Sequence, residues 1–172
     1  MPTIGVAVAI PEPWATELQD YRTSIGDAMA ATIPTHVTLV PPTDVGDDEL
    51  EKIEAHLAAV AADRRPFDVH LRGTGSFRPV SPVVFVGLVE GISQCEQLAD
   101  AVRQGPLAVD LAYPYHPHVT IAHDVAEAQL DRAFGELAEF ECRFVVGHFG
   151  LYVHHQQRGW TPTRCFPLSP GT

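Results

Sequence analysis

The hydrophobic pattern of the first half of the chain predicts a strand, a helix, a strand, a helix and a strand. Residues 3–10 alternate between large apolar and small side chains, which is the period of a half-buried strand. Apolar residues then recur at helical spacing over 11–31 and over 47–62, which predicts two helices. The run THVTLV between them, closed by Pro41-Pro42, predicts the second strand. The run FDVHLRGTGSF predicts the third, with a bulge or a close backbone approach at its glycines.

The second half of the chain repeats this order. SPVVFVGLVE predicts an opening strand, and Ser93 with Glu96 predicts a capping box for the next helix, whose buried stripe is Cys95, Leu98 and Val102. PHVTIAH predicts the following strand. Asp124 with Glu127 caps a last helix, whose apolar stripe is Leu130, Phe134 and Leu137. FECRFVVGHFGLYV and WTPTRCFPL predict the closing strands.

Two copies of one unit, roughly residues 1–82 and 83–172, predict a single bilobal domain that spans the whole chain. The fold class is α+β, with two pseudo-symmetric lobes, each an antiparallel sheet with helices packed outside. Similar lobes usually face each other across a central cleft, which is where ligands bind.

A His-x-Thr triplet stands on the middle strand of each unit, as His36-Val37-Thr38 and as His118-Val119-Thr120. Side chains two positions apart in a strand share a face, so each histidine projects with its threonine. One such triplet is weak evidence in a chain with nine histidines. Two triplets on equivalent strands predict one site with two imidazoles and two hydroxyls. The alternative is a pair of half-buried strand histidines that bond only to backbone groups.

This set of groups suits phosphodiester cleavage. A neutral histidine can take a proton from water or a hydroxyl, and a protonated one can give a proton to the departing oxygen. The hydroxyls of Thr38 and Thr120 can donate to the non-bridging phosphate oxygens, where charge develops. The scheme requires no metal, and we expect no cofactor.

Charge and cysteine content narrow the range of partners. The net charge is −11 and Lys52 is the only lysine, so a long nucleic-acid duplex is a poor ligand. A small phosphate ester or the end of an RNA strand can still bind at a locally positive site.

Three cysteines without a CxxC pair favour reduced thiols in a cytoplasmic protein. No apolar run approaches the ~20 residues of a membrane span, and we expect a monomer with no membrane partner.

At the two motifs the sequence resembles a known family. IPTHVTLVPP and YHPHVTIAHD are similar to the paired signature of the 2H phosphoesterases, which include 2′-5′ RNA ligase-like proteins and RNA 2′,3′-cyclic phosphodiesterases. The resemblance covers nearly the whole chain, because the repeat order matches the two-lobe architecture of that family. It implies that His36 and His118 are the acid–base pair, that Thr38 and Thr120 bind phosphate, and that the substrate is a 2′,3′-cyclic phosphate or a related 2′-5′ linkage.

Three further residues are candidates for substrate binding. Tyr115, just before the second motif, can stack on a base or pack under its own loop. Arg78 can reach a phosphate or stay a solvated turn arginine. Many members of the family carry an arginine shortly after the second motif, and His123 stands near that place here. His116, His118 and His123 do not match a known zinc-ligand spacing, so no metal site is predicted.

We therefore expect a metal-independent phosphoesterase that opens 2′,3′-cyclic phosphates at nucleotide or short RNA ends. One histidine activates water and the other protonates the leaving oxygen, and the sequence does not assign which does which. The alternatives are reversible 2′-5′ RNA ligation, cleavage of another small cyclic phosphodiester, a metal-dependent hydrolase, and a non-catalytic module that holds a phosphorylated ligand or an RNA end.

Overall fold

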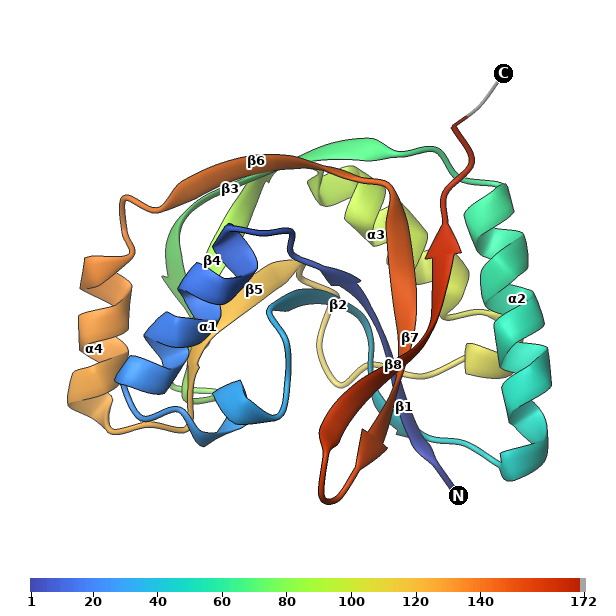
Figure 1. Cartoon of the computed structure of the whole chain (residues 1–172). Coiled ribbons are helices and arrows are strands. Elements are labelled where there is room, and N and C mark those ends of the chain that lie inside the picture. Colours follow the sequence, from blue (N-terminus) through green and yellow to red (C-terminus); the bar gives the residue numbers. More distant parts are fainter. Residues whose placement is uncertain (171–172) are drawn as a thin grey trace.

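Two curled four-stranded antiparallel sheets form the centre of the molecule, and the computed structural model describes residues 1–170 of the chain (Figure 1). The first sheet has the order β2 (His36–Asp44), β1 (Thr3–Ala9), β7 (His148–His155) and β8 (Gly159–Pro167). The second has the order β5 (His118–His123), β4 (Val83–Glu90), β3 (Phe67–Ser76) and β6 (Glu141–Val146). All neighbouring strands run antiparallel, which confirms the predicted α+β class.

In each sheet the motif strand lies at one edge beside the first strand of its own half, but each sheet contains strands from both halves of the chain. β3, from the first half, pairs with β4 and β6 of the second half. β7, from the second half, pairs with β1. The sheets therefore do not divide the chain at the boundary between the two predicted repeats, 1–82 and 83–172. Both strands that carry a His-x-Thr triplet, β2 and β5, are edge strands of their sheets.

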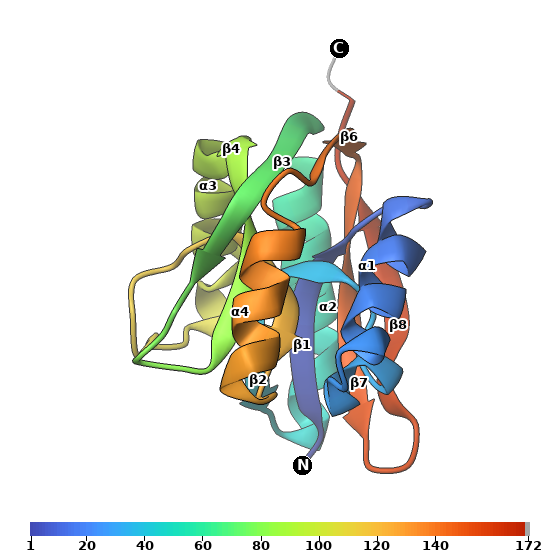
Figure 2. The same cartoon turned by 90° about the vertical axis from the view of Figure 1, so that its left-hand side faces the viewer.

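Two helices likewise cover the sheet whose motif strand belongs to the other half of the chain, α1 on the second sheet and α3 on the first. α1 (Trp14–Ser24) contacts β5, and α4 (Glu127–Glu136) contacts β3, β4 and β5, so both cover the second sheet (Figure 1). α3 (Ile92–Val102) contacts β2, and α2 (Leu50–Ala62) contacts β8 and α3, so these two cover the first sheet. Figure 2 shows α1 and α4 side by side. None of the helices in residues 1–170 has the length and apolar character that a membrane-spanning segment requires.

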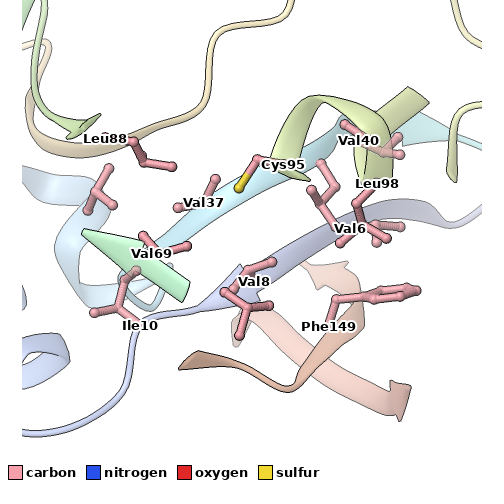
Figure 3. Packing of buried hydrophobic residues seen from close by; sticks show 14 of the residues in the cluster. Val6, Val8, Ile10, Val37, Val40, Val69, Leu88, Cys95, Leu98 and Phe149 are labelled. Carbon is pink, nitrogen blue, oxygen red and sulfur yellow. The ribbon is translucent and has the colours of Figure 1, made fainter. Parts of the chain in front are cut away.

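One continuous apolar core joins the two sheets to their helices. Its members include Val6 and Val8 of β1, Val37 of β2, and Cys95 and Leu98 of α3, all at most 3% exposed (Figure 3). The predicted stripe of α3 is confirmed, because Cys95, Leu98 and Val102 are all buried. Because residues from both sheets belong to the same cluster, packing fixes the position of one sheet against the other.

The predicted helix over 11–31 is wrong at its end, because the chain turns at Gly26. Gly26 has a φ of +82°, in the left-handed region that glycine adopts without steric cost. The Asp27 N–H donates to the Arg22 carbonyl at 3.0 Å, and the Gly26 N–H donates to the Thr23 carbonyl at 3.1 Å. These two bonds form a Schellman motif, which ends α1. The remaining residues form a short 3₁₀ helix, Ala28–Ala31.

The predicted helix caps are also wrong. α3 begins after Gly91 and α4 after Ala126, and neither residue forms a side-chain capping bond. Phe134, placed by its spacing on the apolar stripe of α4, is 43% exposed.

Two strand boundaries differ from the prediction. β2 continues through Pro41-Pro42 to Asp44, because the two prolines fall where the pairing of this edge strand with β1 shifts register between Val6 and Ile4. The long run 140–153 divides at Gly147 into β6 and β7, which lie in different sheets.

Candidate active site

β2 places the first triplet through the alternation of its side chains. Val37 and Leu39 are 1% and 0% exposed and fix the strand to the core. His36 and Thr38 lie half-buried on the opposite face. The neighbouring positions on β1 are Ala9 and Ala7, whose short side chains do not cover the histidine and the threonine.

β5 places the second triplet in the same way. Val119 and Ile121 are fully buried, and His118 and Thr120 are half-buried on the other face. Gly87 of β4 stands opposite His118 in the strand register, as Ala9 stands opposite His36. Each histidine therefore has a residue with little or no side chain beside it.

The structure brings the two motif strands together. β2 and β5 are in contact at the centre of the molecule, where the two sheets meet (Figure 1). The positive charge of His118 contributes to the pKa of His36, so the two imidazoles are close enough to interact. A convergence of the four predicted residues on one site is therefore compatible with the strand arrangement.

Each motif histidine is oriented by a hydrogen bond of the same kind, from its ring to a backbone carbonyl two residues earlier. His36 Nδ1 lies 2.6 Å from the carbonyl oxygen of Pro34, and His118 Nδ1 lies 2.6 Å from the carbonyl oxygen of His116. A carbonyl only accepts, so Nδ1 carries the hydrogen in both rings. In the neutral rings the lone pair is therefore on Nε2, which leaves this nitrogen for proton transfer. Backbone bonding alone does not account for these histidines, because it uses one ring nitrogen of each.

Burial lowers the pKa of both histidines. For His36 burial is the largest cause, the hydrogen bond to Pro34 opposes it, and the positive charges of Arg22 and His118 lower the pKa further. For His118 burial is again the largest cause, the bond to His116 opposes it, and the charge of His116 lowers the pKa. Both imidazoles therefore favour the neutral form at lower pH than an exposed histidine, whose pKa is about 6.5.

An aromatic wall surrounds the second histidine. The rings of Phe77 and Phe85 lie 4.9 and 5.3 Å from the ring of His118, measured between centroids. Phe85 occupies its place because Gly75 has no side chain: a Cβ there would lie 2.5 Å from the Phe85 ring. The predicted close approach at the glycines of β3 is thereby confirmed at Gly75. The two phenylalanines were not among the predicted site residues.

A hollow adjoins the first motif. Its lining includes His36, Thr38, Tyr152 and Trp160. Trp160 lies over Gly5, where a Cβ would approach the indole ring to 3.3 Å. Tyr152 and Trp160 were also missed from the sequence, and the signals for them are Gly150 and Gly5, which make room for their rings.

Tyr115 connects the second motif loop to the first motif strand. Its hydroxyl donates to the Thr38 carbonyl oxygen at 2.7 Å, and the Arg103 guanidinium lies 5.6 Å from its ring centroid. Its ring packs against the core, and burial is the largest cause that raises its pKa. Of the two predicted roles for Tyr115, the geometry favours packing over base stacking.

Arg78 and His123 lie against other parts of the protein. Arg78 Nη1 contacts Glu127 at 2.9 Å and Asp131 at 2.8 Å, so its charge is compensated by α4. The backbone N–H of His123 donates to the Asp27 carboxylate at 3.0 Å. Within residues 1–170, no three His, Cys, Asp or Glu side chains are grouped in a way that could hold a metal ion.

Comparison with known proteins agrees with this geometry. A family model described as the 2′-5′ RNA ligase superfamily matches residues 10–158. The chain belongs to the 2′-5′ RNA ligase superfamily. This superfamily member is 28% identical over 148 residues to a Bacillus cytotoxicus protein named "Putative phosphoesterase Bcer98_0945", across 85% of this chain and 86% of that protein.

Solved structures share the fold of this superfamily member. E. coli LigT, in a crystal structure with 3′-AMP, superposes with a TM-score of 0.76 at 21% identity, across 98% of this chain and 99% of LigT. TT0787 of Thermus thermophilus superposes with a TM-score of 0.72 at 25% identity, across 98% of each chain. The family match and the named relatives support a phosphoesterase as the coarse activity.

Proposed function

We propose that this protein hydrolyses 2′,3′-cyclic phosphodiesters at nucleotide or RNA ends by metal-independent acid–base catalysis. The observation that carries the proposal is the matched pair of histidines, His36 and His118, on contacting edge strands with identical Nδ1 bonds. A reaction that needs one proton removed and one proton supplied is served by two imidazoles that differ only in protonation. The threonines Thr38 and Thr120 supply hydroxyl donors for the phosphate oxygens.

The proposed reaction is a balanced displacement at phosphorus. Nε2 of the neutral histidine takes a proton from water, and the water oxygen forms a bond to phosphorus. The bond from phosphorus to the 2′- or 3′-oxygen breaks, and the protonated histidine gives its Nε2 proton to that oxygen. The product is a nucleotide monoester, and the proton gained by one ring replaces the one lost by the other.

The hollow beside His36 suits the nucleoside part of the substrate. Its lining includes the aromatic side chains of Tyr152 and Trp160, whose faces can stack on a base. LigT, which shares the fold, has been solved with 3′-AMP, ATP and NADP⁺. A nucleoside over Trp160 and Tyr152 would put its cyclic phosphate toward the two motifs.

The test is hydrolysis of the four nucleoside 2′,3′-cyclic monophosphates across pH 5 to 9, with and without EDTA. Turnover that resists EDTA, with separate losses on His36→Ala and His118→Ala, supports the proposal, and the product isomer identifies the oxygen that leaves. Loss of turnover on chelation would indicate a metal-dependent hydrolase instead. Saturable binding of a cyclic-phosphate-ended oligonucleotide without product would indicate a binding module.

Ligation of RNA through a 2′-5′ linkage is the second candidate, favoured by the family match. It uses the same displacement at phosphorus, with a 5′-hydroxyl in place of water as the nucleophile and the 3′-oxygen as the leaving group. Incubation with tRNA halves that end in a 2′,3′-cyclic phosphate and a 5′-hydroxyl separates the two reactions by product length.

The three cysteines are free thiols, including the exposed Cys165, which fits a cytoplasmic enzyme.

A further inference from the structure

An arginine lies on the core face of α1. Arg22 follows the fully buried Leu18 by one helical turn and precedes the buried Ile25, so it belongs to the apolar stripe of the helix. Only 4% of Arg22 is exposed. A charged side chain is costly at such a position unless it is paired or binds a ligand, so its partners indicate its role.

The turn that ends α1 holds this arginine by one nitrogen. The Schellman motif at Gly26 brings Asp27 back onto Arg22, and the Asp27 carboxylate accepts from Arg22 Nε at 2.8 Å. The same carboxylate accepts from the backbone N–H groups of Met29 and His123, each at 3.0 Å. Arg22 is therefore anchored where α1 meets the end of β5.

The two terminal nitrogens of Arg22 are not used by this anchor. Within the part of the chain that the structure describes, Nε is the one guanidinium nitrogen of Arg22 with a hydrogen-bond partner. Neither terminal nitrogen is among the buried side-chain atoms without a partner, so both retain access to solvent. The anchored guanidinium thus has two charged donors without a partner among the described residues.

This pair of donors is close to the catalytic candidates. α1 contacts β5, which carries His118 and Thr120. After burial and the bond to Pro34, the charge of Arg22 is the next largest influence on the pKa of His36, ahead of the charge of His118. The charge of Arg22 therefore reaches His36, and the contact of α1 with β5 places this helix beside the strand that carries the second motif.

We propose that Arg22 is a phosphate-binding residue of this site, with its two terminal nitrogens donating to non-bridging oxygens of the substrate phosphate. Asp27 holds Nε and so fixes the plane of the guanidinium, whose fork geometry matches two phosphate oxygens. The positive charge compensates the phosphate in a protein whose net charge is −11. This inference rests on the proposed function for the identity of the phosphate as part of the substrate.

The test measures the binding of inorganic phosphate by calorimetry, with thermal unfolding of each variant as the check on folding. Arg22→Lys keeps the charge, but its single nitrogen is occupied by Asp27. The double variant Arg22→Gln/Asp27→Asn keeps a hydrogen-bonded pair without charge. We expect both to bind phosphate roughly 10- to 100-fold more weakly than the wild type, the loss of one charge-assisted contact. Arg132→Gln, which removes an ion-paired arginine from the neighbouring α4, is the control with unchanged affinity.

Folded variants that retain wild-type phosphate affinity would overturn the proposal, and so would a wild type that does not bind phosphate at millimolar concentration. If neither variant folds, the wild type with isotope-labelled arginine decides. Phosphate must then shift the side-chain resonances of Arg22 in NMR spectra, and unchanged resonances would refute the contact.

Failure of this inference is distinguishable from failure of the proposed function. Phosphate binding that depends on Arg22, in a protein that hydrolyses no cyclic phosphodiester, would retain the phosphate site and reject the reaction. Hydrolysis with an unchanged KM in folded Arg22 variants would retain the reaction and reject the role of Arg22.

Discussion

The two halves of the site share their innermost residues and differ in what surrounds them. Each half has a histidine bonded through Nδ1 to the carbonyl two residues earlier, and a threonine two residues later. Around His118 the neighbours are aromatic rings, Phe77 and Phe85. Around His36 there is an open hollow on one side and the buried charge of Arg22 nearby.

We infer from this difference that the matched histidines carry out proton transfer and that their unlike surroundings select the substrate. Proton transfer needs two similar imidazoles, and the pseudo-symmetric strands supply them. A substrate such as a nucleotide is not symmetric, so its base requires a space that exists on one side only. We infer that the hollow beside His36 sets the direction in which the substrate lies, and the phenylalanine wall closes the other side.

The largest effect is expected from removal of either imidazole, because the two histidines are the groups that both halves of the site have in common. We expect His36→Ala and His118→Ala each to lower kcat roughly 100- to 10,000-fold, the usual contribution of a positioned acid or base. His155→Ala, at an exposed position, is the control with normal activity. Full activity in either site variant, on a substrate that the wild type cleaves, would contradict a two-histidine mechanism.

The pH dependence sharpens the comparison of the two histidines. Both pKa values are lowered, so the histidine that acts as the acid loses its proton at a lower pH than an exposed imidazole. We expect kcat/KM to decline by about tenfold per pH unit on the alkaline side, beginning below the ordinary value of about 6.5. A flat profile up to pH 8 would contradict the assignment.

The charge of Arg22 should affect one histidine more than the other. The charge of Arg22 lowers the pKa of His36, whereas the charge that lowers the pKa of His118 is that of His116. In an NMR titration of Arg22→Gln/Asp27→Asn we therefore expect the pKa of His36 to rise while that of His118 stays near its wild-type value. Equal shifts in the pKa values of both histidines would contradict a charge effect of Arg22 that acts mainly on His36.

Substitution of Trp160 tests whether the hollow binds the base of the substrate. We expect Trp160→Ala to raise KM for nucleoside 2′,3′-cyclic monophosphates about tenfold, because one stacked base contributes about 1–3 kcal/mol. Hydrolysis of a cyclic phosphate without a base is the internal control and should be unaffected by the variant. An equal loss on both substrates would mean that Trp160 supports the strand and not the base.

The smallest effect concerns the link between the two motifs. Tyr115→Phe removes the hydroxyl that donates to the Thr38 carbonyl. We expect a loss of about 1 kcal/mol in the free energy of unfolding, seen as a fall in Tm of about 2–4 °C, with only a slight effect on KM. A large rise in KM with an unchanged Tm would instead restore the base-stacking role for Tyr115.

The sequence alone was enough to predict the strand faces and the two motifs. Alternation placed Val37 and Val119 in the core and His36 and His118 on the opposite faces of their strands, and the buried fractions agree. A period of two determines which side chains share a face, and it holds wherever one face is packed. The α+β class followed from the same patterns.

Partners between strands could not be predicted in this way, because alternation says nothing about which strand lies beside which. Trp160 and Phe85 were missed for that reason, although Gly5 and Gly75 mark the space that their rings occupy. Arg22 was missed because apolar spacing alone predicts the buried stripe of a helix. A charge within such a stripe, followed by Gly26-Asp27, is the sequence signal for Arg22.

The exchange of β3 and β7 between the halves makes the site indivisible. A fragment that ended after β3 would contain one histidine motif, but its sheet would lack the strand β7 that pairs with β1. The complementary fragment would lack β3, the strand between β4 and β6. We therefore expect neither half to fold alone, so that both histidine motifs are gained and lost together when the chain folds and unfolds.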